Sequence, residues 1–195
     1  MRKHIFSLLA ILVSLTVSAK GSIDPKYAEG AVPVDENGSV FFSHTIDIPE
    51  QLSQDDCYKM ILSWAKGRFA KPYAQAGRII SENEDTRRFV VHVNQTLTFK
   101  HTGMVIDESD IEFNFSVAVG EKSVTAVITD IRYRYEEGRE GGGMAFTAEE
   151  WITDEEAFNA KHTKFYKRVG KFRIKTIDMK DRLFGSMSET LSEDK

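Results

Sequence analysis

The sequence predicts a two-layer α+β domain, in which an antiparallel sheet of about five strands carries helices on one face. Apolar and polar residues alternate along several runs, as they do in strands with one buried face. Short turns separate successive runs, which is typical of antiparallel neighbours. Two longer stretches place apolar residues three or four positions apart, as amphipathic helices do. The expected order is β-α-β-β-β-β-α.

The clearest strand pair lies within residues 111–135, where a short loop containing Gly120 joins two alternating runs. In the first run the apolar residues that share one parity are Ile111, Phe113, Phe115, Val117 and Val119. In the second run they are Val127, Ile131, Tyr133 and Tyr135. We therefore expect a hairpin with one buried and one solvated face.

A strand, a helix and two more strands precede this hairpin. The first strand covers 40–48. The helix lies between Ser53, its expected N-cap, and Pro72, which cannot continue a helix. Its apolar positions are Cys57, Ile61, Trp64, Ala65 and Phe69. A short strand over 77–83 follows, and then a long strand that ends near Lys100.

A long connection with a flexible glycine run at 141–143 follows the hairpin. Residues 147–150 have the spacing of a capping box, and we expect Trp151 to pin this turn to the body. Asp154 is the expected cap of a second short helix that ends at Lys161.

The last element is a long amphipathic helix that begins near Lys164 or just after Gly170. Its apolar residues are Phe172, Thr176, Ile177, Met179, Leu183, Phe184, Met187 and Leu191. This stripe predicts a helix that covers the buried face of the sheet.

Residues 1–19 have the features of a secretory signal peptide: a basic start at Arg2 and Lys3, an apolar run, and small residues before the cleavage point. The alternative is an uncleaved anchor, but the run is shorter than the roughly 20 apolar residues that span a bilayer. We expect export through a cleaved signal peptide to the periplasm or cell surface, and no integral membrane protein. An extended arm would occupy 20–38, and a single domain 39–195.

The charge and the cysteine content of the chain argue against two further classes of protein, nucleic-acid binders and disulfide-stabilised domains. Without Arg2 and Lys3 the net charge falls from −4 to −6, so the mature chain is a poor nucleic-acid binder. Cys57 is the single cysteine, which excludes an internal disulfide. Because Cys57 and His44 both fall on apolar faces, we expect a buried structural thiol and a hydrogen-bonded core histidine.

Four stretches resemble an uncharacterised family of exported bacterial proteins: KYAEGAVP at 26–33, IRYRY at 131–135, AEEWITD at 148–154 and GKFRIKTIDMK at 170–180. That family is described as a domain of unknown function with a fold like the TATA-box-binding protein. The resemblance implies a strand order that agrees with the one above. It implies no activity and no catalytic residues, and a shared fold does not carry DNA binding with it.

No catalytic motif is present, so we expect no catalytic residues and no cofactor. The histidines show no metal-ligand spacing, so we also expect no metal. One alternative remains: His92 and Glu112 both fall on the solvated face, and on neighbouring strands they would form an acid–base pair.

Two surfaces are candidate ligand or partner sites. The first is the solvated sheet face, where small polar groups offer hydrogen bonds at low entropic cost; its residues include His92, Asn94, Thr96 and Asn114. The alternative is an ordinary solvated face. The second is a basic stretch over 161–175, which contains Lys164, Lys167, Arg168 and Lys171, and to which Arg132 and Arg134 would add. It would bind phospholipid head groups or an acidic protein, or else pair with the acidic connection over 136–156.

The sequence therefore leaves the function unknown. The leading hypothesis is a non-catalytic binding or accessory module of the bacterial cell envelope, with an envelope protein, lipid or glycan as partner and no nucleic acid. The alternatives are an enzyme that uses His92 and a carboxylate, and a structural subunit of an envelope assembly.

Overall fold

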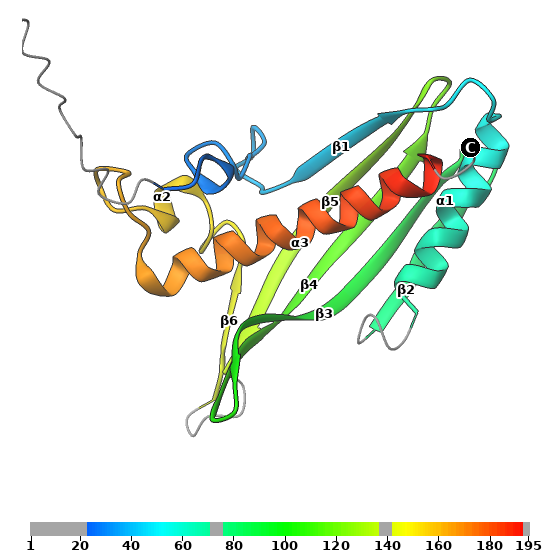
Figure 1. Cartoon of the computed structure of the whole chain (residues 1–195). Helices are drawn as coiled ribbons and strands as arrows, with labels where there is room; N and C mark the ends of the chain where they lie inside the picture. The colour runs from blue at the N-terminus through cyan, green and yellow to red at the C-terminus, as the bar shows by residue number, and fades with distance from the viewer. Residues whose placement is uncertain (1–22, 71–75, 137–141, 193–195) are drawn as a thin grey trace, which may run out of the picture.

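The computed structural model describes residues 23–70, 76–136 and 142–192. Its strands form one antiparallel sheet in the order β1-β5-β4-β3-β2, and β6 pairs with the second half of β5 (Figure 1). The elements are η1 (Pro25–Tyr27), β1 (Phe42–Asp47), α1 (Gln54–Arg68), β2 (Ala76–Asn83), β3 (Arg88–Thr102), β4 (Val105–Val119), β5 (Ser123–Tyr135), β6 (Met144–Thr147), α2 (Asp154–Ala157) and α3 (Lys167–Ser192).

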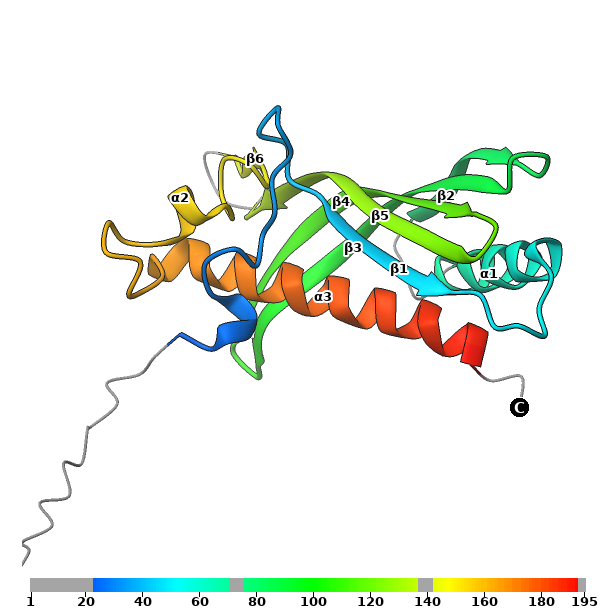
Figure 2. The same ribbon diagram turned by 90° about the horizontal axis from the view of Figure 1, so that it is seen from above.

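The predicted fold class is confirmed, because α1 and α3 lie on one side of the sheet and leave its other side without a helix in the described ranges (Figure 2). β6 was not predicted. Its four residues are too few to show an alternating pattern, and its place in the sheet depends on pairing with β5. The signal peptide predicted at 1–19 and the first residues of the predicted arm, 20–22, lie outside the described residues.

The core lies between the sheet and the two helices. Every residue of the apolar stripe predicted for α3 is buried. On α1 the predicted face is buried as well, except that Trp64 stays half-buried and donates from Nε1 to Ser186 Oγ of α3 at 3.1 Å. Ser53 caps α1 as expected, since its Oγ accepts the backbone N–H of Asp56 at 3.1 Å. The helix ends at Arg68, before the predicted end, while Pro72 lies outside the described residues.

β5 differs from its predicted pattern at one point. Val127 was expected on the buried face, but the buried residues of this half are Val124, Ala126 and Ile128. The prediction was wrong because β5 contains an extra residue, Asp130, which has a left-handed φ of 55° at a register shift against β4. A β-bulge of this kind reverses which face the following residues occupy.

The connection between β6 and α3 follows part of the prediction. The capping box forms, with Thr147 N donating to Glu150 Oε2 at 2.8 Å and Glu150 N donating to Thr147 Oγ1 at 3.4 Å. Trp151 stacks on Phe146 at a centroid separation of 3.9 Å, which attaches the turn to the body. Asp154 is not the cap of α2: it is the first helical residue, after Thr153, and the helix ends at Ala157 rather than Lys161.

The N-terminal arm is folded onto the domain instead of being extended. Asp24 accepts the N–H of Lys26 and caps the short helix η1, for which Pro25 supplies a suitable φ. Tyr27 Oη donates to Asp178 of α3 at 2.7 Å, and Val32 is part of the core. The arm therefore lies along the first half of α3 (Figure 2).

Candidate functional site

The polar face of the sheet, which is the side opposite α1 and α3, carries cross-strand rows of polar side chains. The strand registers give three rows: Arg78–His92–Asn114–Thr129, Asn94–Glu112–Arg132–Thr147 and Thr96–Asp110–Arg134–Ala145. The four residues that were predicted for a sheet-face site, His92, Asn94, Thr96 and Asn114, therefore lie together. Arg132 and Arg134 were expected to add to the basic stretch over 161–175, but the strand registers place both of them in the rows of the polar face.

The bulge at Asp130 adds a carboxylate to this face. Its Oδ2 accepts from Asn114 Nδ2 at 2.8 Å and from Thr129 Oγ1 at 3.0 Å. Because the Asn114 amide donates to Asp130, its Oδ1 is left to accept from His92 Nδ1, 3.1 Å away. This relay places the proton of neutral His92 on Nδ1 and leaves Nε2 as the acceptor.

His92 and Glu112 lie on neighbouring strands, as their proposed pairing requires, but in different rows. His92 bonds to Asn114. The Glu112 carboxylate instead forms an ion pair with Arg134, with Oε1 2.8 Å from Nη2, and accepts from Asn94 Nδ2 at 3.4 Å. In the described part of the chain, the carboxylate that His92 reaches is Asp130, and only through the Asn114 amide.

Arg132 is the exposed cation at the centre of this face. It lies opposite Glu112 in register, but Glu112 pairs with Arg134. Across the described ranges, Arg132 makes no hydrogen bond or ion pair. Its five N–H donors are therefore available to a ligand.

Three shallow hollows on this side of the molecule share Arg132 in their walls. The first has a volume of about 320 Å³ and is lined by His92, Glu112, Asn114, Asp130 and Arg132. The second, of about 330 Å³, extends toward β6, Thr147 and Glu150. The third, of about 430 Å³, lies between the start of β1 and β6 and includes Asp35, Asp130 and Glu149. Arg132 is thus reachable from three directions.

The carboxylates around Arg132 already have partners inside the protein. Asp130 Oδ2 is held by Asn114 and Thr129, and Glu150 Oε2 accepts Thr147 N. Glu149 Oε1 accepts the backbone N–H of Val40 at 2.7 Å. One oxygen of each of these carboxylates is therefore occupied, and Arg132 supplies unused donors at the centre of the face.

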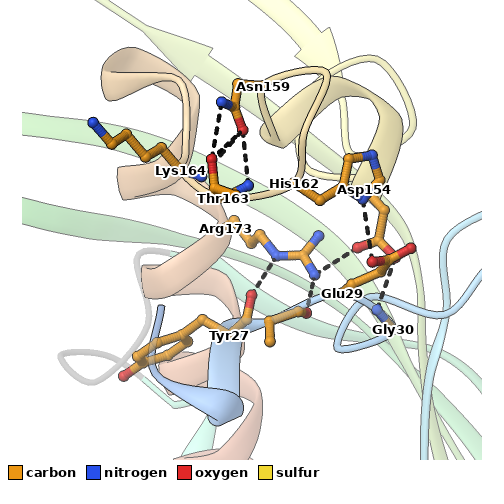
Figure 3. Close-up of polar contacts among 10 residues, drawn as sticks. Tyr27, Glu29, Gly30, Asp154, Asn159, His162, Thr163, Lys164 and Arg173 are labelled. Carbon is orange, nitrogen blue, oxygen red and sulfur yellow. Dashed lines mark hydrogen bonds and ion pairs between the residues drawn. The ribbon is translucent and has the colours of Figure 1, made fainter. Parts of the chain in front are cut away.

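The basic stretch over 161–175 is not one surface. Arg173 is fully buried and clamps the arm to α3 and α2 (Figure 3). Its guanidinium donates to the carbonyl oxygens of Tyr27, Ala28 and Ile152 at 2.9, 2.6 and 2.7 Å, and pairs with Asp154 at 2.7 Å. Burial lowers the pKa of Arg173, and Asp154 opposes this shift. Two roles were expected for the basic stretch: binding an anionic partner, or pairing with the acidic connection over 136–156. Arg173 has the second role, because it pairs with Asp154.

Lys171 is also used inside the protein. Its Nζ lies 2.7 Å from Asp107 Oδ2, donates to Tyr135 Oη at 2.8 Å, and sits 4.4 Å from the ring centroid of Phe99. Burial raises the pKa of Tyr135, and its acidic neighbours add to the shift. The cations that remain exposed at the start of α3 are Lys161, Lys164, Lys167 and Arg168.

Comparison with known families identifies the chain. A family model described as "Domain of unknown function (DUF4468) with TBP-like fold" matches residues 42–134, which run from β1 to the end of β5. A crystal structure of a DUF4468 family protein from Bacteroides ovatus is 26% identical and has a TM-score of 0.78, covering 88% of this chain and 96% of that chain. The chain belongs to the DUF4468 family.

A second solved structure shows the fold alone. A TBP-like protein from Parabacteroides distasonis is 20% identical with a TM-score of 0.68, covering 84% of this chain and 99% of that chain. The search of curated proteins gave no match. The family assigns a fold and no function, so the chemistry of this DUF4468 protein has to be inferred from its own side chains.

Within 23–70, 76–136 and 142–192, no cluster of three or more His, Cys, Asp or Glu side chains is arranged to hold a metal ion. In the same ranges, no helix has the length and apolarity needed to cross a bilayer.

Three contributors to the polar face and to the Arg173 clamp were not predicted. Arg78 is exposed and lies opposite His92. Asp130 reaches Asn114 because of the bulge. The available sequence signal for this bulge was the three-residue step between the apolar residues Ile128 and Ile131. Arg173 stands at a buried helical position, so its place in the apolar periodicity was the available signal.

Proposed function

We propose that this DUF4468 protein is a non-catalytic binding module of the bacterial cell envelope, exported through a cleaved signal peptide. Its ligand presents a carboxylate to Arg132 on the polar face. The observation that carries the proposal is an exposed guanidinium with free donors, reachable from three hollows, among carboxylates that already have partners. Export is supported by the residue pattern of 1–19.

The charge of the site selects the class of anion. A guanidinium binds a carboxylate through two parallel N–H···O bonds. Glu112, Asp130, Glu149 and Glu150 lie in the walls of the same hollows, so a ligand with two charges meets strong repulsion. A single carboxylate among neutral hydroxyl or amide groups fits best, because Asn114, His92 and Thr147 can bond those groups. An acidic glycan and the C-terminus of a peptide both have this chemistry.

The binding test compares the two sources of a carboxylate. Glucuronate oligosaccharide, and a short peptide with a free or amidated C-terminus, are titrated while backbone amide shifts are followed by NMR. The proposal predicts shifts at 112–114 and 130–134 with one of the acidic probes, and their loss in Arg132→Gln. Arg78→Gln, which removes an exposed arginine from the same face, is the matched control and retains binding.

Two results count against the proposal. One is that neither acidic probe shifts these amides. The other is that Arg132→Gln and Arg78→Gln weaken binding equally, since a general field effect would then explain it. Native mass spectrometry of protein purified gently from its host envelope complements the titration, because a retained glycan or peptide mass names the ligand.

The relay from His92 through Asn114 to Asp130 favours one competing function, an enzyme in which His92 Nε2 accepts a proton. A screen of hydrolase and transferase substrates tests it. Turnover that His92→Ala abolishes would replace the binding proposal with an enzymatic one. The other alternative, a structural subunit, predicts a stable oligomer with further copies or another envelope protein.

A further inference from the structure

The tip of the β3–β4 hairpin exposes three consecutive large apolar residues. Met104 is 96% exposed, Val105 48% and Ile106 61%. Elsewhere in the described ranges, exposed large hydrophobic residues stand singly, as Val34, Ile80 and Tyr166 do. Clustering of this kind is uncommon on a surface that faces only water.

The hairpin extends beyond the body of the sheet (Figure 1). Among the described residues, β4 pairs with β5 from Ser109 onward, so within those ranges residues 98–108 form a two-stranded ribbon. An isolated ribbon is marginally stable in water, but this one is held at its base. Phe99 packs on Phe172 at a centroid separation of 4.5 Å, and Asp107 accepts from Lys171 and from Tyr135 Oη. The fold thus holds the apolar tip away from the core.

We propose that this tip inserts into the acyl region of a lipid bilayer and attaches the protein peripherally to a membrane. Val105 and Ile106 are successive strand residues, so they point to opposite faces of the ribbon, and Met104 lies at its end. A flat protein surface would cover only one side of such a tip. A fluid acyl layer surrounds it and removes all three side chains from water.

The charges behind the tip fit a lipid interface. Lys100 and His101 are exposed and lie about 10 and 7 Å behind Gly103 of the turn at 3.3 Å per residue, where anionic head groups would be. Across the ribbon, Asp107 opposes Lys100 in register but is paired with Lys171. Glu108 lies farther from the tip than Lys100 does. Among the described residues, Lys100 is therefore the unpaired charge nearest the interface.

Vesicle flotation tests the proposal with the mature chain. Vesicles of phosphatidylethanolamine and phosphatidylglycerol should carry the protein upward, and the double substitution Met104→Asp with Ile106→Asp should weaken this binding at least about tenfold. Ile80→Asp is the matched control, because Ile80 is 47% exposed on β2, at the other end of β3, and should retain binding.

A second measurement follows the tip directly. Cys57 is fully buried, so a Met104→Cys variant can be labelled at one site with an environment-sensitive fluorophore. The emission should shift to the blue when these vesicles are added, and the same label on Ile80→Cys should not respond.

Three results would overturn the proposal: wild-type protein that does not float, a tip variant that floats as well as wild type, or a label at residue 104 that stays in water. Loss of binding in Lys164→Glu with Lys167→Glu, together with full binding of the tip variant, would assign membrane contact to the start of α3 instead. None of these results bears on carboxylate binding at Arg132, which is assayed separately without lipid.

Discussion

Arg173 and Asp154 form an ion pair of 2.7 Å in which the arginine side chain is fully buried. Asp154 Oδ2 also accepts the backbone N–H of Gly30 at 2.7 Å, so the pair joins the N-terminal arm, α2 and α3 at one point (Figure 3). Each of the carbonyl oxygens that Arg173 contacts would otherwise need another donor. The clamp therefore determines where the arm lies.

Replacing Arg173 by methionine should lower the free energy of unfolding by about 3–5 kcal/mol, because it leaves the half-buried Asp154 carboxylate without its cation and three carbonyl groups without their donor. Urea denaturation measures the loss. Arg182→Met on the exposed side of α3 is the control and should change stability by less than about 0.5 kcal/mol. Equal effects of the two substitutions would mean that the clamp contributes nothing specific.

Two glycines of α3 should respond oppositely to alanine. A Cβ at Gly170 would lie 2.5 Å from Phe165 Cβ, whereas one at Gly185 would meet nothing within 4 Å. Gly185→Ala should stabilise the protein by about 0.5–1 kcal/mol through its helix propensity. Gly170→Ala should destabilise it by about 1–3 kcal/mol, since Phe165 must move. Thermal unfolding of both variants checks this, and a stabilising Gly170→Ala would show that Phe165 yields freely.

The bulge at Asp130 should tolerate asparagine and reject valine. Asparagine adopts the left-handed φ of 55° and can still accept from Asn114, so Asp130→Asn should stay within about 0.5 kcal/mol of wild type. Asp130→Val places a β-branched residue in that conformation and should cost about 1–3 kcal/mol. Chemical denaturation measures both, and indistinguishable variants would argue that the bulge carries no strain.

Alkaline pH should destabilise the protein, in part through Cys57. Burial raises the pKa of this thiol from 9.0 to about 11. Between these values the unfolded chain binds fewer protons than the folded one, so the stability present below pH 9 is lost as pH rises toward 11. Burial raises the pKa of Tyr133 with the same sign. Urea denaturation across this range should show a shallower decline in Cys57→Ala, and an unchanged slope would exclude the thiol as a cause.

Prediction from sequence succeeded where the pattern is local. The α3 stripe, the Ser53 cap, the capping box at 147–150 and the alternation in β3 each depend on residues a few positions apart. These features define two amphipathic helices and several half-buried strands. They determined the α+β class and the polar character of the exposed sheet face before any contact was known.

The tertiary structure decided what depends on distant residues. Pairing of β1 with β5, and of β6 with the other half of β5, is settled by which edge each strand can reach. The register of β3 against β4 places His92 opposite Asn114 and thereby separates it from Glu112. The register of β4 against β5 includes the extra residue at Asp130, and because Glu112 pairs with Arg134, Arg132 has no partner among the described residues.

Sequence by itself thus determined the class of fold and placed His92, Asn94, Thr96 and Asn114 on the polar face, but it did not place Arg78 or Asp130 there. The tertiary structure decided which charged side chains form ion pairs inside the protein. Arg173 and Lys171 look like surface cations in the chain, but the fold uses both internally, whereas Arg132 remains exposed. The physical reason is that periodicity reports which face a residue occupies, while ion pairing depends on atoms brought together by long-range packing.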